Sequence, residues 1–178
     1  MNWKVLAGTL PFVIGLIVLL ASGFGKDPFA LPMAMVGKPA PRFILQTLDG
    51  KREVDLAALK GKTVVVNFWA TWCVPCWQEH AALQDAAKRH DPAEVVFLGV
   101  VYEDSRDEAQ EYLQKKGSAY ENLFDPGTRA AISYGVGGVP ESYFVSPGGM
   151  IVEKFNGPLD AQSIDSLVAR SQRDGGAR

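Results

Sequence analysis

Cys73 and Cys76 are the only cysteines of the 178-residue chain, and two residues separate them. Two thiols at this spacing can form and break a disulfide between themselves, which is the chemistry of thiol–disulfide exchange. The apolar run at residues 64–69 predicts a buried strand, and the helical pattern at residues 74–90 places Cys73 at the first turn of a helix. The free N–H groups and the dipole of that turn favour a thiolate and lower the pKa of a thiol from about 8.5 by roughly one unit. We therefore expect an exposed Cys73 thiolate that attacks, and a shielded Cys76, one turn deeper, that resolves the mixed disulfide.

Other uses of a Cys-x-x-Cys pair fit the sequence less well. Structural zinc takes four ligands, and without a second cysteine pair the candidate set is only Cys73, Cys76 and His80. Covalent haem attachment needs a histidine directly after the second cysteine, where this chain has Trp77. We therefore expect no metal and no cofactor besides the redox-active disulfide.

Two acidic residues are candidates for tuning the cysteine pair. Glu79 follows Cys76 by three residues and so lies one helical turn further, at the edge of the buried face. If it is buried its pKa rises, and it can relay protons to Cys76 or, when ionised, disfavour a thiolate; the alternative is a side chain that reaches solvent. Glu141 follows Pro140 at the start of a predicted strand, and its alternative is an ordinary surface position. His80 is expected to pack on the helix rather than to act in catalysis.

The rest of the pattern alternates strands and helices. The apolar runs at residues 64–69 and 95–101, with a helix between them, predict a βαβ unit with parallel strands. Further helices are expected at residues 105–116, near 128–133 and after an Asp160 cap, and further strands at 122–124, 142–146 and 151–155. The glycine-rich residues 135–138 lead into a strand, which excludes a phosphate-binding loop. This order predicts an α/β, thioredoxin-like fold of three layers with a mixed central sheet.

The N-terminal residues predict a membrane segment. No charged residue lies between Lys4 and Lys26, and residues 5–25 supply about the 20 residues that a spanning helix needs. The alternative is a cleaved signal peptide, with small residues at 21–23 for the peptidase. We expect one transmembrane helix, with the C-terminal domain outside the cytoplasm. The predicted parts are a membrane anchor at 1–25, a proline-rich tether at 26–41, the globular domain at 36–173 and a frayed tail at 174–178.

The composition limits the class of protein. With 47% hydrophobic and 21% charged residues, the chain fits one globular domain with an appendage and is not a disordered protein. The formal net charge is −2, and no arm or patch is strongly basic. Nucleic-acid binding is therefore not expected.

Four segments carry a resemblance to a known family. They are residues 37–43, which read Gly37-Lys38-Pro39-Ala40-Pro41-x-Phe43, residues 67–80, Tyr102-Glu103-Asp104 and residues 134–141. They resemble the membrane-anchored thioredoxin-like proteins of the TlpA/ResA group and, within it, the CcmG family (also called DsbE) of cytochrome c maturation thiol:disulfide oxidoreductases. Glu79-His80 and Pro140-Glu141 are the features that resemble CcmG in particular.

Carried over position by position, the resemblance implies roles for individual residues. Cys73 and Cys76 would be catalytic, with Trp72, Glu79, Val139, Pro140 and Glu141 in supporting roles. A cis peptide bond before Pro140 would face the cysteine pair, and the Val139 backbone would hydrogen-bond an extended substrate. The two glutamates would tune the site. Trp77 is a departure, because relatives often have Arg or Lys there, whose charge would stabilise a thiolate.

The resemblance also implies an activity. The protein would be a periplasm-facing reductase, held by one helix in the inner (cytoplasmic) membrane, that reduces the Cys-x-x-Cys-His cysteines of apocytochrome c directly or through a cytochrome c maturation protein. An oxidising compartment keeps thiols paired, so such a reductase needs its own electron supply. A membrane electron conduit of the CcdA or DsbD kind would re-reduce it.

Four other functions were weighed against the sequence. A general TlpA-like disulfide reductase, or an oxidase of secreted proteins, would share the fold, and the reduction potential separates reductase from oxidase. A copper-handling, Sco-like binding protein would use a wider cysteine spacing and a distant histidine. A peroxidase of the peroxiredoxin kind would need a Pro-x-x-x-Thr-x-x-Cys setting, which Cys73 lacks.

Overall fold

The computed structural model describes residues 3, 11, 13–18 and 35–174. The chain divides into two units, Met1–Pro32 and Met33–Arg178. In the first unit residues 13–18 are helical. Among the residues that are described, no helix has both the length and the apolar character needed to cross a membrane. Most of the anchor predicted at residues 1–25 and most of the predicted tether lie outside the described residues.

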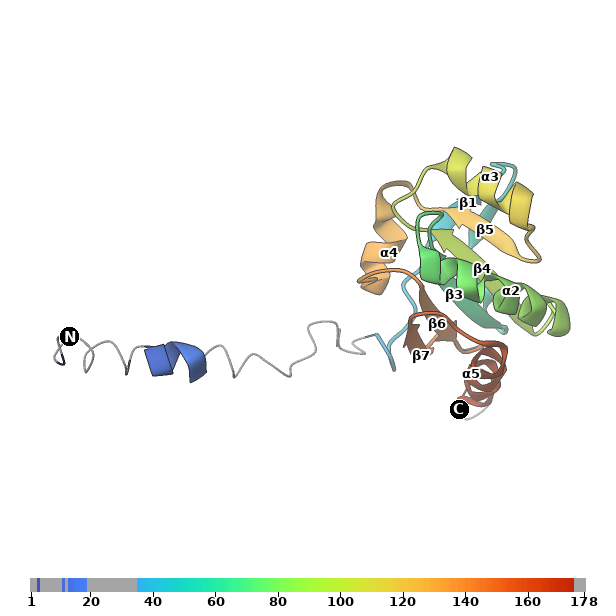
Figure 1. The fold of residues 1–178 in the computed structure, drawn as a ribbon. Coiled ribbons are helices and arrows are strands. Elements are labelled where there is room, and N and C mark those ends of the chain that lie inside the picture. Colours follow the sequence, from blue (N-terminus) through green and yellow to red (C-terminus); the bar gives the residue numbers. More distant parts are fainter. Residues whose placement is uncertain (1–2, 4–10, 12, 19–34, 175–178) are drawn as a thin grey trace. The chain divides into compact units, whose positions relative to one another are not determined.

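The described strands of the second unit form one mixed sheet (Figure 1). They are β1 (Ile44–Thr47), β2 (Glu53–Asp55), β3 (Thr63–Trp69), β4 (Val95–Val101), β5 (Glu121–Phe124), β6 (Glu141–Val145) and β7 (Ile151–Asn156), in the spatial order β2-β1-β5-β4-β3-β6-β7. β4 runs parallel to both β3 and β5, whereas β6 is antiparallel to both β3 and β7. The predicted parallel pair and the mixed sheet are confirmed.

Helices cover both faces of this sheet. They are α2 (Val74–Arg89), α3 (Arg106–Lys116), α4 (Arg129–Tyr134) and α5 (Ala161–Asp174), with short 3-10 turns at Leu56–Leu59 and Pro126–Thr128. α2 and α5 pack over Val65 and Phe97, whereas α4 packs over Val64 and Val66 on the opposite face. Every residue of β3 is buried, because alternate side chains enter the two cores. Helix, sheet and helix form the three predicted layers.

Two segments precede β3 in the domain, and only the first differs from the sequence prediction. Strands β1 and β2 form an antiparallel hairpin that was not predicted, since both are short and β1 exposes the apolar Ile44 while it buries the polar Thr47. Residues 37–40, where the predicted tether and the predicted domain overlap, hydrogen-bond to residues 149–151 at the start of β7. The Gly37 N–H donates to the Ile151 carbonyl, and the Ala40 N–H donates to the Gly149 carbonyl. This part of the chain therefore belongs to the domain.

The sheet brings the cysteine motif and Pro140 to the same edge. β3 ends at Trp69, the chain turns, and α2 begins at Val74. β6 begins at Glu141 and pairs antiparallel with β3, with Glu141 opposite Phe68. The end of β3 and the start of β6 are therefore neighbours, which places residues 70–76 beside residues 135–140.

Candidate active site

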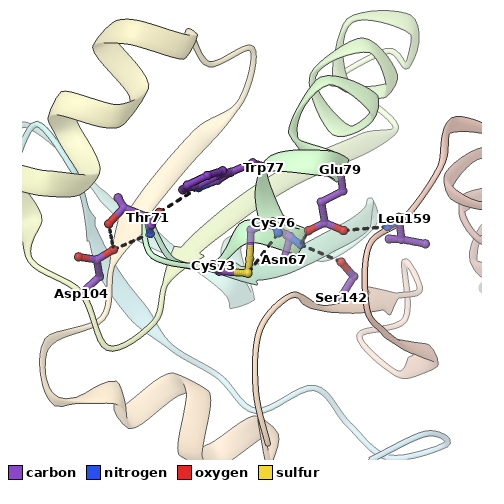
Figure 2. Close-up of a disulfide and its surroundings, with 9 residues drawn as sticks. All are labelled: Asn67, Thr71, Cys73, Cys76, Trp77, Glu79, Asp104, Ser142 and Leu159. Atoms are coloured by element: carbon purple, nitrogen blue, oxygen red, sulfur yellow. Dashed lines mark hydrogen bonds between the residues drawn. A yellow bond between two sulfur atoms is a disulfide. The ribbon is translucent and has the colours of Figure 1, made fainter.

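Cys73 and Cys76 are joined by a disulfide at the start of α2 (Figure 2). Cys73 is the N-cap residue, and its Sγ accepts a hydrogen bond from the Cys76 N–H at 3.1 Å. Pro75 fits the first turn because its missing N–H is not needed there. The predicted place of Cys73 at the helix start is confirmed. An N–H aimed at its sulfur is the contact that favours a thiolate once the disulfide opens.

The predicted difference in exposure between the two cysteines is wrong for this disulfide form. Cys73 is 3% exposed and Cys76 is 5% exposed. The N-cap geometry turns the Cys73 sulfur back over the first turn towards Cys76, while the side chains on either side, Trp72 and Val74, are more than half exposed. In the disulfide form, therefore, both cysteines are shielded from solvent.

Asp104 holds the turn that leads into the cysteine motif. Its Oδ2 accepts hydrogen bonds from the Thr71 N–H at 2.6 Å and from the Thr71 hydroxyl at 2.7 Å (Figure 2). The indole N–H of Trp77 donates to the Thr71 carbonyl, and that of Trp72 donates to the Glu103 carbonyl. Asp104 was not among the predicted site residues. The available signal is that it follows β4, a strand parallel to β3, so both loops leave the sheet at one edge.

Glu79 is buried, at 1% exposure, so the alternative of a side chain in solvent is wrong. Its carboxylate accepts hydrogen bonds from the Asn67 amide at 2.7 Å and from the Leu159 N–H at 2.9 Å (Figure 2). The Asn67 amide also donates to the hydroxyl of Ser142. Burial raises the pKa of Glu79 to about 7, against the opposing effect of the two hydrogen bonds. Asn67 was not among the predicted site residues. The feature that could have identified it is an amide side chain inside an otherwise apolar strand.

Glu141 is also buried, at 2% exposure, and the alternative of a surface position is wrong. Its carboxylate accepts hydrogen bonds from the Gly137 N–H at 3.0 Å and from the Tyr143 hydroxyl at 3.1 Å. It also forms an ion pair with Lys154, whose side chain is 4% exposed. Lys154 was not among the predicted site residues, because nothing in a local pattern links it to a glutamate on the neighbouring strand.

The peptide bond between Val139 and Pro140 is cis, as the resemblance implied. Val139 packs against the apolar cluster that contains Cys73 and Cys76. The two carboxyls lie on opposite faces of the sheet. Glu79 reaches Ser142 through Asn67 on the α2 face, whereas the neighbouring Glu141 joins Tyr143 on the α4 face.

His80 packs as expected. Its ring lies edge-on to Tyr112, with 5.4 Å between the ring centres, and its Nε2 is 3.1 Å from the Gly117 carbonyl oxygen. Burial lowers the pKa of this imidazole. Within residues 35–174, no three His, Cys, Asp or Glu side chains are grouped as metal ligands would be.

The sequence matches a known family. Residues 36–154 match the model of the AhpC/TSA family. The chain is 40% identical to the thiol:disulfide interchange protein DsbE of Allochromatium vinosum, over 92% of each chain. The chain belongs to the AhpC/TSA family, among the DsbE-type thiol:disulfide interchange proteins.

Further relatives agree with this placement. The chain is 40% identical to the thiol:disulfide interchange protein HelX of Rhodobacter capsulatus, over 81% of this chain and 83% of that one. A solved thiol:disulfide interchange protein of the thioredoxin family from Chlorobium tepidum TLS superposes with a TM-score of 0.68 at 29% identity, over 75% of this chain and 94% of the other. The α/β fold is therefore thioredoxin-like, and the Cys73–Cys76 disulfide fits the thiol:disulfide oxidoreductases of this family.

Proposed function

We propose that this DsbE-type protein is a periplasm-facing thiol:disulfide reductase that reduces the cysteine pair of apocytochrome c, directly or through a maturation partner. The observation that carries the proposal is the Cys73–Cys76 disulfide at the N-terminus of α2, beside a cis Pro140. The 40% identity to DsbE and HelX proteins supports the same activity. The Pro140-Glu141 pair and Glu79 support the assignment to cytochrome c maturation, through the resemblance to CcmG.

The proposed reaction moves two electrons from the protein to the substrate. The Cys73 thiolate attacks one sulfur of the substrate disulfide, and the other substrate sulfur leaves as a thiolate and takes up a proton. Cys76 then loses its proton and attacks the Cys73 sulfur, which releases the second substrate thiol and leaves the Cys73–Cys76 disulfide. A membrane electron conduit of the CcdA or DsbD kind returns the protein to the dithiol.

The neighbours of the cysteines have proposed roles in this reaction. The N–H of Cys76, which points at the Cys73 sulfur, stabilises the attacking thiolate. Glu79, with a pKa of about 7 and one helical turn from Cys76, takes the proton that Cys76 loses. The Val139 backbone binds the extended substrate next to the disulfide, and Trp72 offers an exposed apolar surface beside it.

The localisation is part of the proposal. In this proposal residues 1–25 form a single transmembrane anchor in the inner membrane. The proline-rich tether is an extended spacer that leads into the periplasm, so the domain lies beside its electron supply. The uncharged stretch between Lys4 and Lys26 supports the anchor.

The test is a trap in the full-length protein. Cys76→Ser removes the resolving thiol, so the mixed disulfide on Cys73 accumulates; we expect an apocytochrome c or a maturation protein to be captured in the membrane fraction and identified by mass spectrometry. Cys73→Ser, with the same number of thiols, is the matched control and captures nothing. Capture of many unrelated secreted proteins would show a general disulfide reductase or oxidase instead, and capture in the soluble fraction would contradict the anchor.

A further inference from the structure

Glu141 is held by a buried cation. The side chains of Glu141 and Lys154 are 2% and 4% exposed, and Lys154 Nζ contacts Glu141 Oε1. The ammonium group also lies 5.3 Å from the centre of the Tyr143 ring. Breaking a buried ion pair by removing one partner leaves an uncompensated charge, which is strongly unfavourable. The position of Glu141 therefore depends on Lys154.

Glu79 differs from Glu141 in the groups that contact its carboxylate. In the described part of the chain its hydrogen-bond donors are both neutral, the Asn67 amide and the Leu159 N–H. Burial accordingly raises the pKa of Glu79 to about 7. The two carboxyls lie on opposite faces of the same sheet, and only Glu141 has a buried cation beside it among these residues. Lys154 thus supplies Glu141 with a buried ion-pair partner.

The carboxylate of Glu141 bridges Lys154 and the loop before Pro140. While Oε1 contacts Lys154, Oε2 accepts the hydrogen bond of the Gly137 N–H at 3.0 Å. Two residues further on, Val139 packs against the cluster that contains both cysteines and is followed by the cis bond to Pro140. A shift of the carboxylate therefore moves the backbone that leads into Val139.

We propose that Lys154 is a positioning residue of the exchange reaction, which acts through Glu141 to fix residues 137–139 where the substrate backbone binds. The inference rests on the proposed function, because it assumes that Val139 binds an extended substrate. It concerns substrate binding only. Lys154 does not touch the cysteines, so the intrinsic reactivity of Cys73 is expected to be independent of it.

The experiment compares two substrates of the reduced full-length protein in detergent, in single turnovers with protein in excess. One is an oxidised decapeptide with a Cys-x-x-Cys-His disulfide, which needs the Val139 backbone; the other is 5,5′-dithiobis(2-nitrobenzoate), a small disulfide that does not. Lys154→Met is expected to raise the half-saturating protein concentration for the peptide about tenfold, the effect of one hydrogen bond to a charged group. The maximal rate constant, and the rate with the small disulfide, stay within about twofold because the cysteines are unchanged.

Two further variants separate positioning from folding. Lys154→Arg keeps the buried charge and is expected to restore tight peptide binding, whereas Lys115→Met removes an exposed lysine on α3 and is expected to leave both substrates unaffected. If Lys154→Met does not fold, the double variant Glu141→Gln with Lys154→Met leaves no unpaired ion. This double variant is expected to raise the half-saturating concentration for the peptide by less than tenfold and to leave the rate with the small disulfide unchanged.

Failure of the positioning role and failure of the proposed function give different results in these experiments. Equal losses with both substrates, or wild-type peptide saturation in Lys154→Met or in the double variant, would overturn the positioning role. A wild-type protein that reacts with the small disulfide but never with the peptide would instead overturn the proposed function. The peptide-selective loss in the lysine variant, rescued by arginine, supports the inference.

Discussion

Glu79 is a buried carboxyl whose charge changes near neutral pH. Its pKa is raised from 4.5 to about 7 because burial disfavours the ionised form. The native protein therefore binds this proton more tightly than the unfolded chain does. The resulting loss of stability is absent below pH 4.5, grows as the pH rises, and is complete above about pH 7.

Glu79→Gln is expected to remove this pH dependence. Between pH 4.5 and 8 the free energy of unfolding of the variant, relative to the wild type, rises by up to about 3 kcal/mol. The measurement is chemical denaturation of the oxidised protein across this range, with Asp85→Asn on the exposed face of α2 as the control. A difference between wild type and Glu79→Gln that stays constant with pH would mean that Glu79 does not titrate there.

Local sequence predicts some of these residues and not others. The cysteine spacing identifies Cys73 and Cys76 because two thiols in one motif have few other uses. The burial of Glu79 was left open, since a residue at the edge of a helix face points inward or outward according to its neighbours, here Asn67 and Leu159. The Glu141–Lys154 pair joins two adjacent strands, and its members are found only once the register of β6 and β7 is known.

The start of α2 and the strands around it place the cysteines. The predicted helix at residues 74–90 is observed as Val74–Arg89, and the predicted Asp160 cap accepts a hydrogen bond from the Ser163 N–H. Such boundaries follow from caps and apolar periodicity. The β1–β2 hairpin was missed because strands this short carry little of that periodicity.

Gly99, in the middle of β4, has no room for a side chain, because the side chains of Asn122 and Trp69 lie against its backbone. A Cβ there would lie 2.1 Å from Asn122 Oδ1 and 2.9 Å from Trp69 Nε1, the two atoms of a hydrogen bond beneath the cysteine loop. Gly99→Ala is therefore expected to lower the free energy of unfolding by about 1–3 kcal/mol, as overpacking does.

The control for Gly99→Ala is Gly148→Ala, where the nearest atom to a new Cβ, Ser146 Oγ, is 3.7 Å away. Both variants are measured by urea unfolding of the oxidised protein. Equal stability of the two variants would contradict the close packing of Trp69 and Asn122.

At the scale of the whole molecule, the proposed function is to donate electrons to a substrate in an oxidising compartment. A reductase needs a Cys73–Cys76 couple near the potential of thioredoxin, about −270 mV, rather than that of a strong oxidant, about −120 mV. We expect the full-length protein, equilibrated with glutathione or dithiothreitol buffers, to have a potential on the reducing side of this range. A value near −120 mV would indicate an oxidase of secreted proteins.

The central claim is that Cys73 becomes the accessible thiolate once the disulfide is reduced, although it is only 3% exposed in the oxidised form. The most direct measurement is the rate at which iodoacetamide alkylates each cysteine of the reduced full-length protein at pH 7, followed by mass spectrometry. Because a helix N-terminus favours the thiolate form of a cysteine, Cys73 is expected to react at least about fivefold faster than Cys76. Equal rates, or faster alkylation of Cys76, would contradict the assignment of Cys73 as the attacking thiol.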